Sequence, residues 1–102
     1  MAGEAFHVGW RLDKAARNLR KHHVGFAEAA TVLDDMHACS EPQDEAGEPR
    51  EKLIGRSSTG RLLAIAVYIE VATGRESAED IGFIRIISAR AATPTEEALY
   101  LS

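Results

Sequence analysis

The sequence predicts a single α+β domain: an antiparallel sheet of three or four strands, two N-terminal helices and a short C-terminal helix. Three observations support this prediction. Apolar residues recur at helical spacing in the first third of the chain, and strand-like apolar segments follow in the second half. A Thr-Pro-x-Glu helix start then lies near the C-terminus. With 102 residues, the chain has room for one hydrophobic core, so residues 1–102 form one domain.

The N-terminal segment predicts a short strand followed by an amphipathic helix. Residues 6–10 alternate between apolar and small or polar side chains, as a strand does. In residues 12–22 an apolar stripe has the spacing i, i+3, i+4, i+7, and we expect it to face the core. The stripe consists of Leu12, Ala15, Ala16 and Leu19. The bases Lys14, Arg17 and Lys21 fall on the opposite side, which predicts a basic outer face.

A second helix is predicted for residues 26–33, with Gly25 at the N-cap position and Glu28 three residues later. Residues 34–49 are acidic and contain Pro42, Gly47 and Pro49, so they are predicted to form a loop.

Three strands are predicted next, at 50–57, 62–69 and 82–90. Ser58-Thr59-Gly60 predicts a hairpin between the first two. Residues 62–69 are apolar on both faces and belong at the sheet centre. The segment 71–81 is polar and predicts a flexible connection.

The C-terminal helix is predicted to begin after Thr93, with Thr93 as N-cap, Pro94 at the first helical position and Glu96 at the third. Such a helix would carry Leu99 and Tyr100 back onto the sheet.

Composition places the chain among soluble globular proteins, with 45% apolar and 27% charged residues. Cys39 is the single cysteine, so no internal disulfide forms. The N-terminus has no signal-peptide pattern, and the longest apolar run is too short to span a membrane. We therefore expect a cytoplasmic protein.

The net charge of −4 argues against a generic nucleic-acid coat, but residues 11–21 are basic and residues 34–51 acidic. A polyanion would thus meet a local basic surface.

Three blocks of residues resemble the BrnT family of ribonuclease toxins. The first is Trp10-x-x-x-Lys14-x-x-x-Asn18-x-x-Lys21-His22, followed by Phe26-Ala27-Glu28-Ala29-Ala30. The second is Leu53-Ile54-Gly55-Arg56-Ser57 with Gly60-Arg61-Leu62-Leu63. The third, and the most specific, is Arg85-Ile86-Ile87-Ser88-Ala89-Arg90 with Ala92-Thr93 and Glu96. The blocks cover nearly the whole chain in the family's order.

The resemblance implies a RelE-like fold and a toxin of a type II toxin–antitoxin system that cleaves RNA as a metal-independent endoribonuclease and so inhibits translation. It also implies a BrnA-like antitoxin with a ribbon-helix-helix DNA-binding domain, in an assembly that is dimeric about the toxin pair. DNA would be contacted only through the antitoxin. No cofactor and no membrane partner are implied.

Two positions depart from the family's pattern. Arg11 stands where the family commonly has aspartate, which removes an N-cap from the first helix, although Asp13 would cap a shorter one. His23 stands where the family commonly has glycine; a left-handed residue there costs roughly 1 kcal/mol more than glycine. The connection 71–81 is also longer than usual. These departures bear on helix ends and loops, and they leave activity open.

RNA cleavage without a metal needs a proton acceptor for the 2′-hydroxyl, cations for the phosphate and a proton donor for the leaving oxygen. His22 is the acid–base candidate, because it matches the motif and histidine titrates near neutrality. The candidates for holding phosphate are Arg56, Arg85 and Arg90, and convergence of these three requires a register that the sequence does not give. Candidates for RNA binding are Lys14, Arg17, Lys21 and Tyr68.

Each candidate also has a purely structural interpretation. His22 would cap a helix C-terminus, and the three bases of the first helix would form a solvated face or contact the acidic loop or the antitoxin. Arg85 would pair with Glu70 on the neighbouring strand. Tyr68 and Trp10 would be packing residues. Asp34, Asp35, His37 and Cys39 lack a known zinc spacing, so no metal site is predicted.

Two alternatives to a ribonuclease remain open. One is a toxin-like binding module that pairs with an antitoxin but has lost cleavage. The other is a non-enzymatic RNA-binding regulator that uses the same basic helix.

Overall fold

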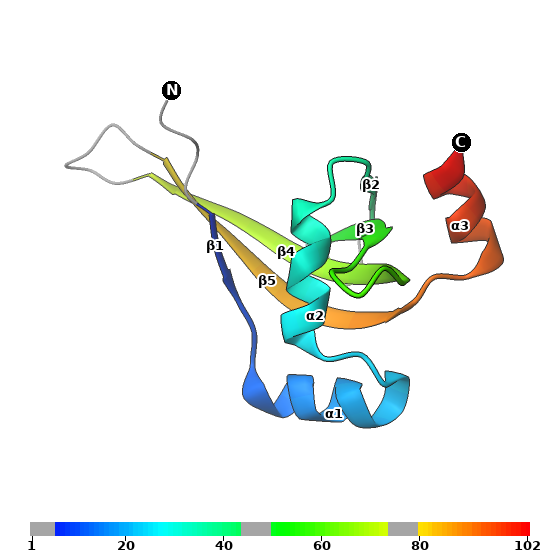
Figure 1. Ribbon diagram of the computed structural model, residues 1–102. Helices are drawn as coiled ribbons and strands as arrows, with labels where there is room; N and C mark the ends of the chain where they lie inside the picture. The colour runs from blue at the N-terminus through cyan, green and yellow to red at the C-terminus, as the bar shows by residue number, and fades with distance from the viewer. Residues whose placement is uncertain (1–5, 44–49, 74–79) are drawn as a thin grey trace.

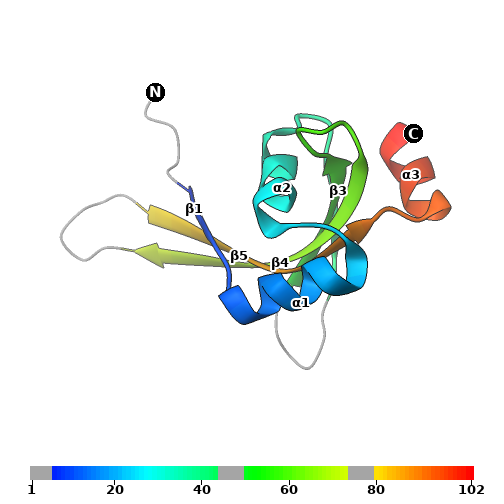
Figure 2. The same ribbon diagram turned by 60° about the horizontal axis from the view of Figure 1, so that its bottom comes forward.

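The structure, a computed structural model, describes residues 6–43, 50–73 and 80–102. A five-stranded sheet with the order β1-β5-β4-β3-β2 is flanked by three α-helices and a short 3₁₀ helix, η1 (Figures 1 and 2). The elements are β1 (Phe6–Gly9), α1 (Leu12–His22), α2 (Phe26–Ala30), η1 (Thr31–Asp34), β2 (Cys39–Pro42), β3 (Arg50–Arg56), β4 (Leu62–Thr73), β5 (Asp80–Ala91) and α3 (Pro94–Leu101).

The sheet differs from the prediction in strand number and in one strand direction. It has five strands instead of three or four, and β1 pairs with β5 in parallel, whereas all the other neighbours are antiparallel. The extra strand, β2, lies within residues 34–49, which were predicted to form a loop. That prediction was wrong for residues 39–42, because an edge strand that ends at Pro42 tolerates the missing N–H. Residues 44–49 lie outside the described part.

The predicted strands and their connections are otherwise close to those observed. β4 lies at the centre of the sheet, as its apolar sequence predicted, and Gly60 (φ 91°) makes the hairpin turn between β3 and β4. β4 continues to Thr73 and β5 begins at Asp80, so the predicted connection 71–81 was too long at both ends. Residues 74–79 of that connection lie outside the described part.

α2 and η1 cover one face of the sheet and form the core with it. Fully buried side chains of Phe26 and Val32 pack with those of Ile65, Val67 and Ile86. The second helix was predicted to run to residue 33 as one α-helix, but it tightens to 3₁₀ geometry at Thr31. A Cβ added to Gly55 would lie 2.9 Å from the Val32 side chain, so glycine permits η1 to approach β3 this closely.

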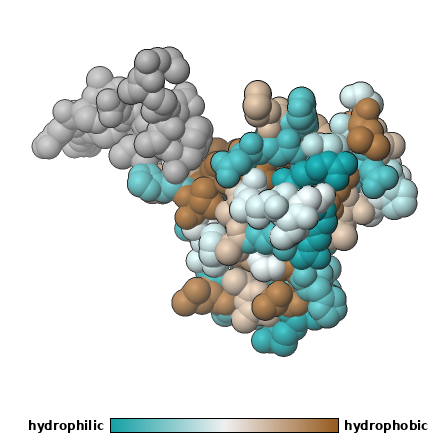
Figure 3. All heavy atoms as spheres, viewed as in Figure 1, coloured by the Kyte–Doolittle hydropathy of each residue, from teal (hydrophilic) through white to brown (hydrophobic). Residues whose placement is uncertain are grey.

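α1 spans the residues predicted, but it presents a different face to the sheet. Leu12 and Leu19 of the predicted apolar stripe are 81% and 53% exposed, and the buried residue of the helix is Asn18. Figure 3 shows hydrophobic atoms on the surface at the bottom of the view, where α1 lies in Figure 1. The prediction of the buried face was therefore wrong. Ala15 alone of the predicted stripe packs against the core.

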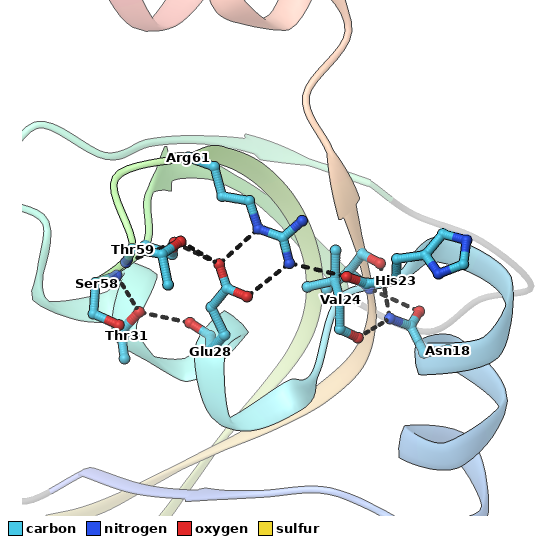
Figure 4. Close-up of polar contacts among 10 residues, drawn as sticks. Asn18, His23, Val24, Glu28, Thr31, Ser58, Thr59 and Arg61 are labelled. Atoms are coloured by element: carbon cyan, nitrogen blue, oxygen red, sulfur yellow. Dashed lines mark hydrogen bonds and ion pairs between the residues drawn. The ribbon is translucent and has the colours of Figure 1, made fainter.

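Asn18 explains why this face is turned inward. β1 covers the edge of β5 only from Gly82 to Arg85, which leaves later residues of β5 without a strand partner on that side. Asn18 Nδ2 donates to the carbonyl of Ala89 at 2.8 Å, and the Ala89 N–H donates to Asn18 Oδ1 at 3.1 Å. Nδ2 also donates to the Val24 carbonyl at 2.9 Å (Figure 4). Buried backbone groups need such partners, so hydrogen bonding and not hydrophobicity sets the rotation of α1.

A second polar cluster joins α2 to the β3–β4 hairpin (Figure 4). Both carboxylate oxygens of Glu28 accept hydrogen bonds from the Arg61 guanidinium, at 2.7 and 2.8 Å. Ser57 and Thr59 also donate to Glu28 Oε2. Arg61 further donates to the carbonyl of His23 at the end of α1. The hydrogen bonds of Arg61, and then those of the two hydroxyls, lower the pKa of Glu28 from its ordinary 4.5 to about 2.

The two ends of α1 show the effects expected from Arg11 and His23: the first turn lacks a side-chain cap, and the C-cap residue is left-handed. Arg11 is the N-cap of α1 and its side chain makes no capping hydrogen bond; Asp13 lies inside the helix and pairs with Arg11 instead of capping a shorter one. His23 adopts the left-handed conformation at the C-cap (φ 59°, ψ 31°). The α3 capping box of Thr93 and Glu96 is confirmed. Tyr100 and Leu99 were both predicted to pack back onto the sheet. The Tyr100 hydroxyl donates to Asp35, in the loop after η1, at 2.7 Å. Leu99 is 44% exposed.

Candidate functional site

The face of the sheet opposite α2, named here the groove face, carries most of the candidate residues. Pairing of the strands places its side chains in rows that run across the sheet. The first row is His7, Phe83 and Glu70; the second is Gly9, Arg85, Tyr68 and Arg50; the third is Ser88, Ala66 and Lys52; the fourth is Arg90, Ala64 and Ile54. Neighbouring rows lie two residues apart, or roughly 7 Å, except that a register shift places Ser88 three residues after Arg85 along β5.

The second row places Tyr68 directly between two arginines. Tyr68 of β4 is paired with Arg50 of β3 on one side and with Arg85 of β5 on the other. Tyr68 is half-buried and Arg85 is exposed. Within the described part of the chain, neither side chain has a hydrogen bond or an ion pair, so the purely structural alternative for Arg85, a salt bridge to Glu70, is not observed. The Arg85 guanidinium is thus available to an external anion.

Two hollows meet at this row. One, of about 600 Å³, extends toward β1 and is lined by His7, Trp10 and Phe83 among others. The other, of about 310 Å³, extends toward α1 and is lined by Lys14, Arg50 and Ile87 among others. Arg11, Tyr68, Glu70 and Arg85 line both. Cations outnumber Glu70, the one acid among the described residues that line the two hollows, so an anion would be attracted to the point where they meet.

His22 lies in a third hollow, which adjoins the second. This hollow, of about 210 Å³, lies between α1 and β5 and is lined by Lys14, Arg17, Asn18, Lys21, His22, Ile87 and Ser88. Lys14 and Ile87 line the second hollow as well. Contrary to the prediction of a purely outer basic face, α1 therefore turns Lys14 toward the sheet. The three hollows together make a groove along β5, and the basic side chains of α1 lie on one side of it.

Arg90 is engaged in a structural ion-pair cluster. Its guanidinium donates to both carboxylate oxygens of Glu96, at 2.6 and 2.8 Å, and Lys52 Nζ lies 2.9 Å from Glu96 Oε2. Glu96 is only 4% exposed, and its Oε1 also accepts the Thr93 N–H. The Arg90 hydrogen bonds hold the pKa of Glu96 far below its ordinary value. This cluster fixes α3 to the groove face and occupies the Nη1 and Nη2 pair of donors with which Arg90 would bind a phosphate.

Arg56 lies at the far end of β3 from Arg50 and does not join Arg85. Its guanidinium lies over the Tyr100 ring, 5.5 Å from the centroid, and donates to the Gly60 carbonyl. Its backbone N–H donates to Asp35, which also accepts from Tyr100 and from the His37 N–H. These hydrogen bonds, that of the Arg56 backbone first, lower the pKa of Asp35. Arg56 therefore lies among groups that attach α3 and the loop after η1 to the sheet.

The structure thus brings together part of the predicted set. Arg85, Tyr68 and Lys14 share one hollow, and His22, Arg17 and Lys21 line the adjoining one, whereas Arg56 and Arg90 lie elsewhere. Sequence reasoning missed Arg50 as a site residue. The signal was weak: Arg50 has the same strand parity as Lys52 and Arg56, but it was counted within an acidic segment, and only the register places it beside Tyr68.

Trp10 supports the packing interpretation, because its ring meets Phe26 edge-on at a centroid distance of 6.0 Å. Across residues 6–43, 50–73 and 80–102, no group of three or more His, Cys, Asp or Glu side chains is placed to hold a metal ion. In the same residues, no helix has the length and apolarity needed to cross a membrane.

The fold and the groove define a small α+β protein whose sheet carries a groove lined by several cationic side chains. The model of a protein family described as "Ribonuclease toxin, BrnT, of type II toxin-antitoxin system" matches residues 10–96. The chain therefore belongs to the BrnT family of ribonuclease toxins, and a type II system implies an antitoxin partner.

A solved structure supports the fold. The crystal structure of the ribonuclease toxin BrnT of Brucella abortus aligns with a TM-score of 0.59 and 21% sequence identity, over 87% of this chain and 97% of the Brucella chain. No curated protein sequence matches this chain.

Proposed function

We propose that this protein is an endoribonuclease that binds single-stranded RNA along the β5 groove and cleaves it at the Arg85–Tyr68 row without a metal ion. The observation that carries the proposal is Arg85, an exposed arginine with no ion pair in the described residues, where two hollows of the groove meet. An arginine held by a strand is preorganised to donate two hydrogen bonds to a phosphate.

In the proposed reaction, the 2′-hydroxyl oxygen attacks the adjacent phosphorus while the bond from phosphorus to the 5′-oxygen breaks. A cyclic phosphate and a free 5′-hydroxyl result. One group accepts the 2′ proton and another donates a proton to the leaving oxygen. Arg85 stabilises the negative charge that grows on the phosphate, and Tyr68 donates a hydrogen bond to it. His22 acts in proton transfer from the adjoining hollow, and Lys14, Arg17 and Lys21 bind the flanking backbone.

The assignment of Arg56 and Arg90 changes in this proposal. Both were candidates for holding the scissile phosphate, but their guanidinium groups already have structural partners. We assign them to fixing α3 and take Arg85 as the arginine of the transition state.

The direct test is cleavage of a defined RNA by the purified protein with a chelator present. Chelator-resistant cleavage that is abolished in Arg85→Ala, with the fold retained, is the expected result. Retention of RNA without cleavage by the wild-type protein would contradict the proposal and favour the non-enzymatic regulator. Absence of both RNA binding and cleavage would favour the inactive binding module.

We also propose that the antitoxin is BrnA-like, with a ribbon-helix-helix domain that makes the complex dimeric and alone contacts DNA. Co-expression and co-purification with the product of the neighbouring reading frame test this. Two folded proteins that elute separately at micromolar concentration would contradict it.

A further inference from the structure

Beyond the cations of the groove, its β1 end carries two exposed aromatic rings that the proposed cleavage does not use. The His7 and Phe83 rings are stacked, with centroids 5.5 Å apart and an angle of 26° between their planes. Phe83 is 42% exposed and His7 is also exposed, although an apolar ring on a sheet surface is more stable when covered. Together they form part of the wall of the largest hollow of the groove.

The surroundings of these rings fit a base better than a phosphate. Glu70 of β4 lies directly opposite Phe83, so the first row consists of two aromatic rings followed by a carboxylate. A carboxylate repels a phosphate but accepts hydrogen bonds from the N–H groups on the edge of a base. Within the described residues Glu70 has neither a hydrogen bond nor an ion pair, so both of its oxygens can accept.

The position of the pair matches the geometry of a nucleotide. The first row lies two residues, or roughly 7 Å, from the row of Arg85 and Tyr68. This spacing lets a phosphate rest at Arg85 while the base of an adjoining nucleotide reaches the rings. Gly9, between His7 and the start of α1, adds no side chain to the surface, and a Cβ there would meet nothing within 4 Å. Gly9 therefore places no side chain in the way of a ligand that extends from the phosphate row to the rings.

We infer that His7, Phe83 and Glu70 form a nucleobase subsite, in which one base of the RNA stacks on the ring pair and donates hydrogen bonds to Glu70. This subsite rests on the proposed function and adds base recognition to it. Bases with an amino group on the pairing edge are favoured. Uracil is disfavoured, because its single N–H lies between two carbonyl oxygens that repel the carboxylate.

The subsite is tested with tetranucleotides whose 2′-hydroxyls are all methylated, so that they bind but lack the attacking group. Each of the four positions is made abasic in turn, and affinity is measured by fluorescence anisotropy. In the wild-type protein, loss of the base at one position is expected to weaken binding roughly tenfold, as for one stacked base. Phe83→Ala and His7→Ala should weaken binding of the intact oligonucleotide similarly, yet leave its abasic form unchanged. Uracil at the same position should bind more weakly than the amino-bearing bases, and Glu70→Gln should reduce that difference.

The matched control is Ile69→Ala. The exposed fraction of Ile69, 40%, is similar to that of Phe83. Ile69 precedes Glu70 along β4, so its side chain points to the other face of the sheet. This variant should bind every oligonucleotide as the wild type does. Equal effects of all four abasic positions, or wild-type affinities for Phe83→Ala and His7→Ala, would overturn the subsite.

Cleavage assays with the unmodified RNA distinguish failure of the subsite proposal from failure of the ribonuclease proposal. If the wild type and Phe83→Ala cleave equally well, the subsite is wrong and the ribonuclease proposal stands. If the wild type neither binds nor cleaves RNA, both proposals fail. If Phe83→Ala weakens only the antitoxin complex, the ring pair is a protein contact and the subsite is again overturned.

Discussion

The side-chain amide of Asn18 is bonded to Ala89 in the way that a neighbouring strand would be, donating to its carbonyl at 2.8 Å and accepting its N–H at 3.1 Å. Because β1 ends its pairing at Arg85, this one side chain replaces the strand that β5 lacks beyond that point. The same contact holds α1 against β5 and so places Lys14 and His22 along the groove.

Asn18→Ala should therefore destabilise the protein severely. It removes three hydrogen bonds and leaves buried backbone groups of Ala89 and Val24 without these partners, each at a cost of about 1–3 kcal/mol. Urea denaturation should show a loss of about 3 kcal/mol or more in the free energy of unfolding. Leu19→Ala on the exposed side of the same helix is the control and should change it by less than about 1 kcal/mol. Equal stability of the two variants would contradict this account of α1.

Arg85→Ala and Arg90→Ala should separate chemistry from structure. Arg85→Ala should slow RNA cleavage by on the order of 100-fold while its melting temperature stays close to that of the wild type, because it loses a donor to the transition state but no partner among the described residues. Arg90→Ala leaves buried Glu96 without its main partner and should cost a few kcal/mol of stability. Both cleavage rates and thermal melts are needed. A stable Arg90→Ala variant with abolished cleavage would restore Arg90 to the phosphate site.

Lys14→Ala and Lys21→Ala should weaken RNA binding and its salt dependence. Removal of one cation from the RNA backbone should reduce the slope of log affinity against log salt by about one. Arg20→Ala removes the same charge from an exposed position that lines none of the three hollows. Binding titrations over a range of salt concentrations should leave the Arg20→Ala slope unchanged. A common slope for all three variants would show that only the net charge of the helix matters.

His22→Gln should alter the pH dependence of cleavage as well as its rate. A side chain in proton transfer contributes about 10²- to 10⁴-fold, and its removal should also abolish one limb of the pH–rate profile. A merely structural role would lower the rate equally at every pH. The comparison of the two profiles, measured under single-turnover conditions, decides between these roles.

The Glu28–Arg61 cluster should make stability fall in acid. The folded-state pKa of Glu28, about 2, is depressed below the ordinary 4.5, so its stabilisation is complete above 4.5 and is lost as the pH falls toward 2. Melting temperatures measured across that window should decline less steeply in Glu28→Gln than in the wild type. Because the Arg90 hydrogen bonds also lower the pKa of Glu96, the variant should retain some decline.

The sequence by itself determined those features that depend on local chemistry. The bounds of α1, the capping box at Thr93 and Glu96, the glycine turn at Gly60 and the central position of β4 all follow from neighbouring residues, and all were predicted. Local patterning also made Arg85 and His22 candidates. The family resemblance extended this interpretation to the whole chain, and the match of the family model confirms it.

Only the tertiary structure decided which faces meet and which of the candidate arginines have partners among the described residues. The apolar stripe of α1 pointed to Leu12 and Leu19, yet the unfilled edge of β5 turns Asn18 inward instead, because a buried backbone group without a partner costs more than an exposed leucine. Likewise, spacing alone ranked Arg56, Arg85 and Arg90 alike. Long-range partners separate them: Glu96 pairs with Arg90, Tyr100 and Gly60 contact Arg56, and the strand register leaves Arg85 beside Tyr68 at the groove.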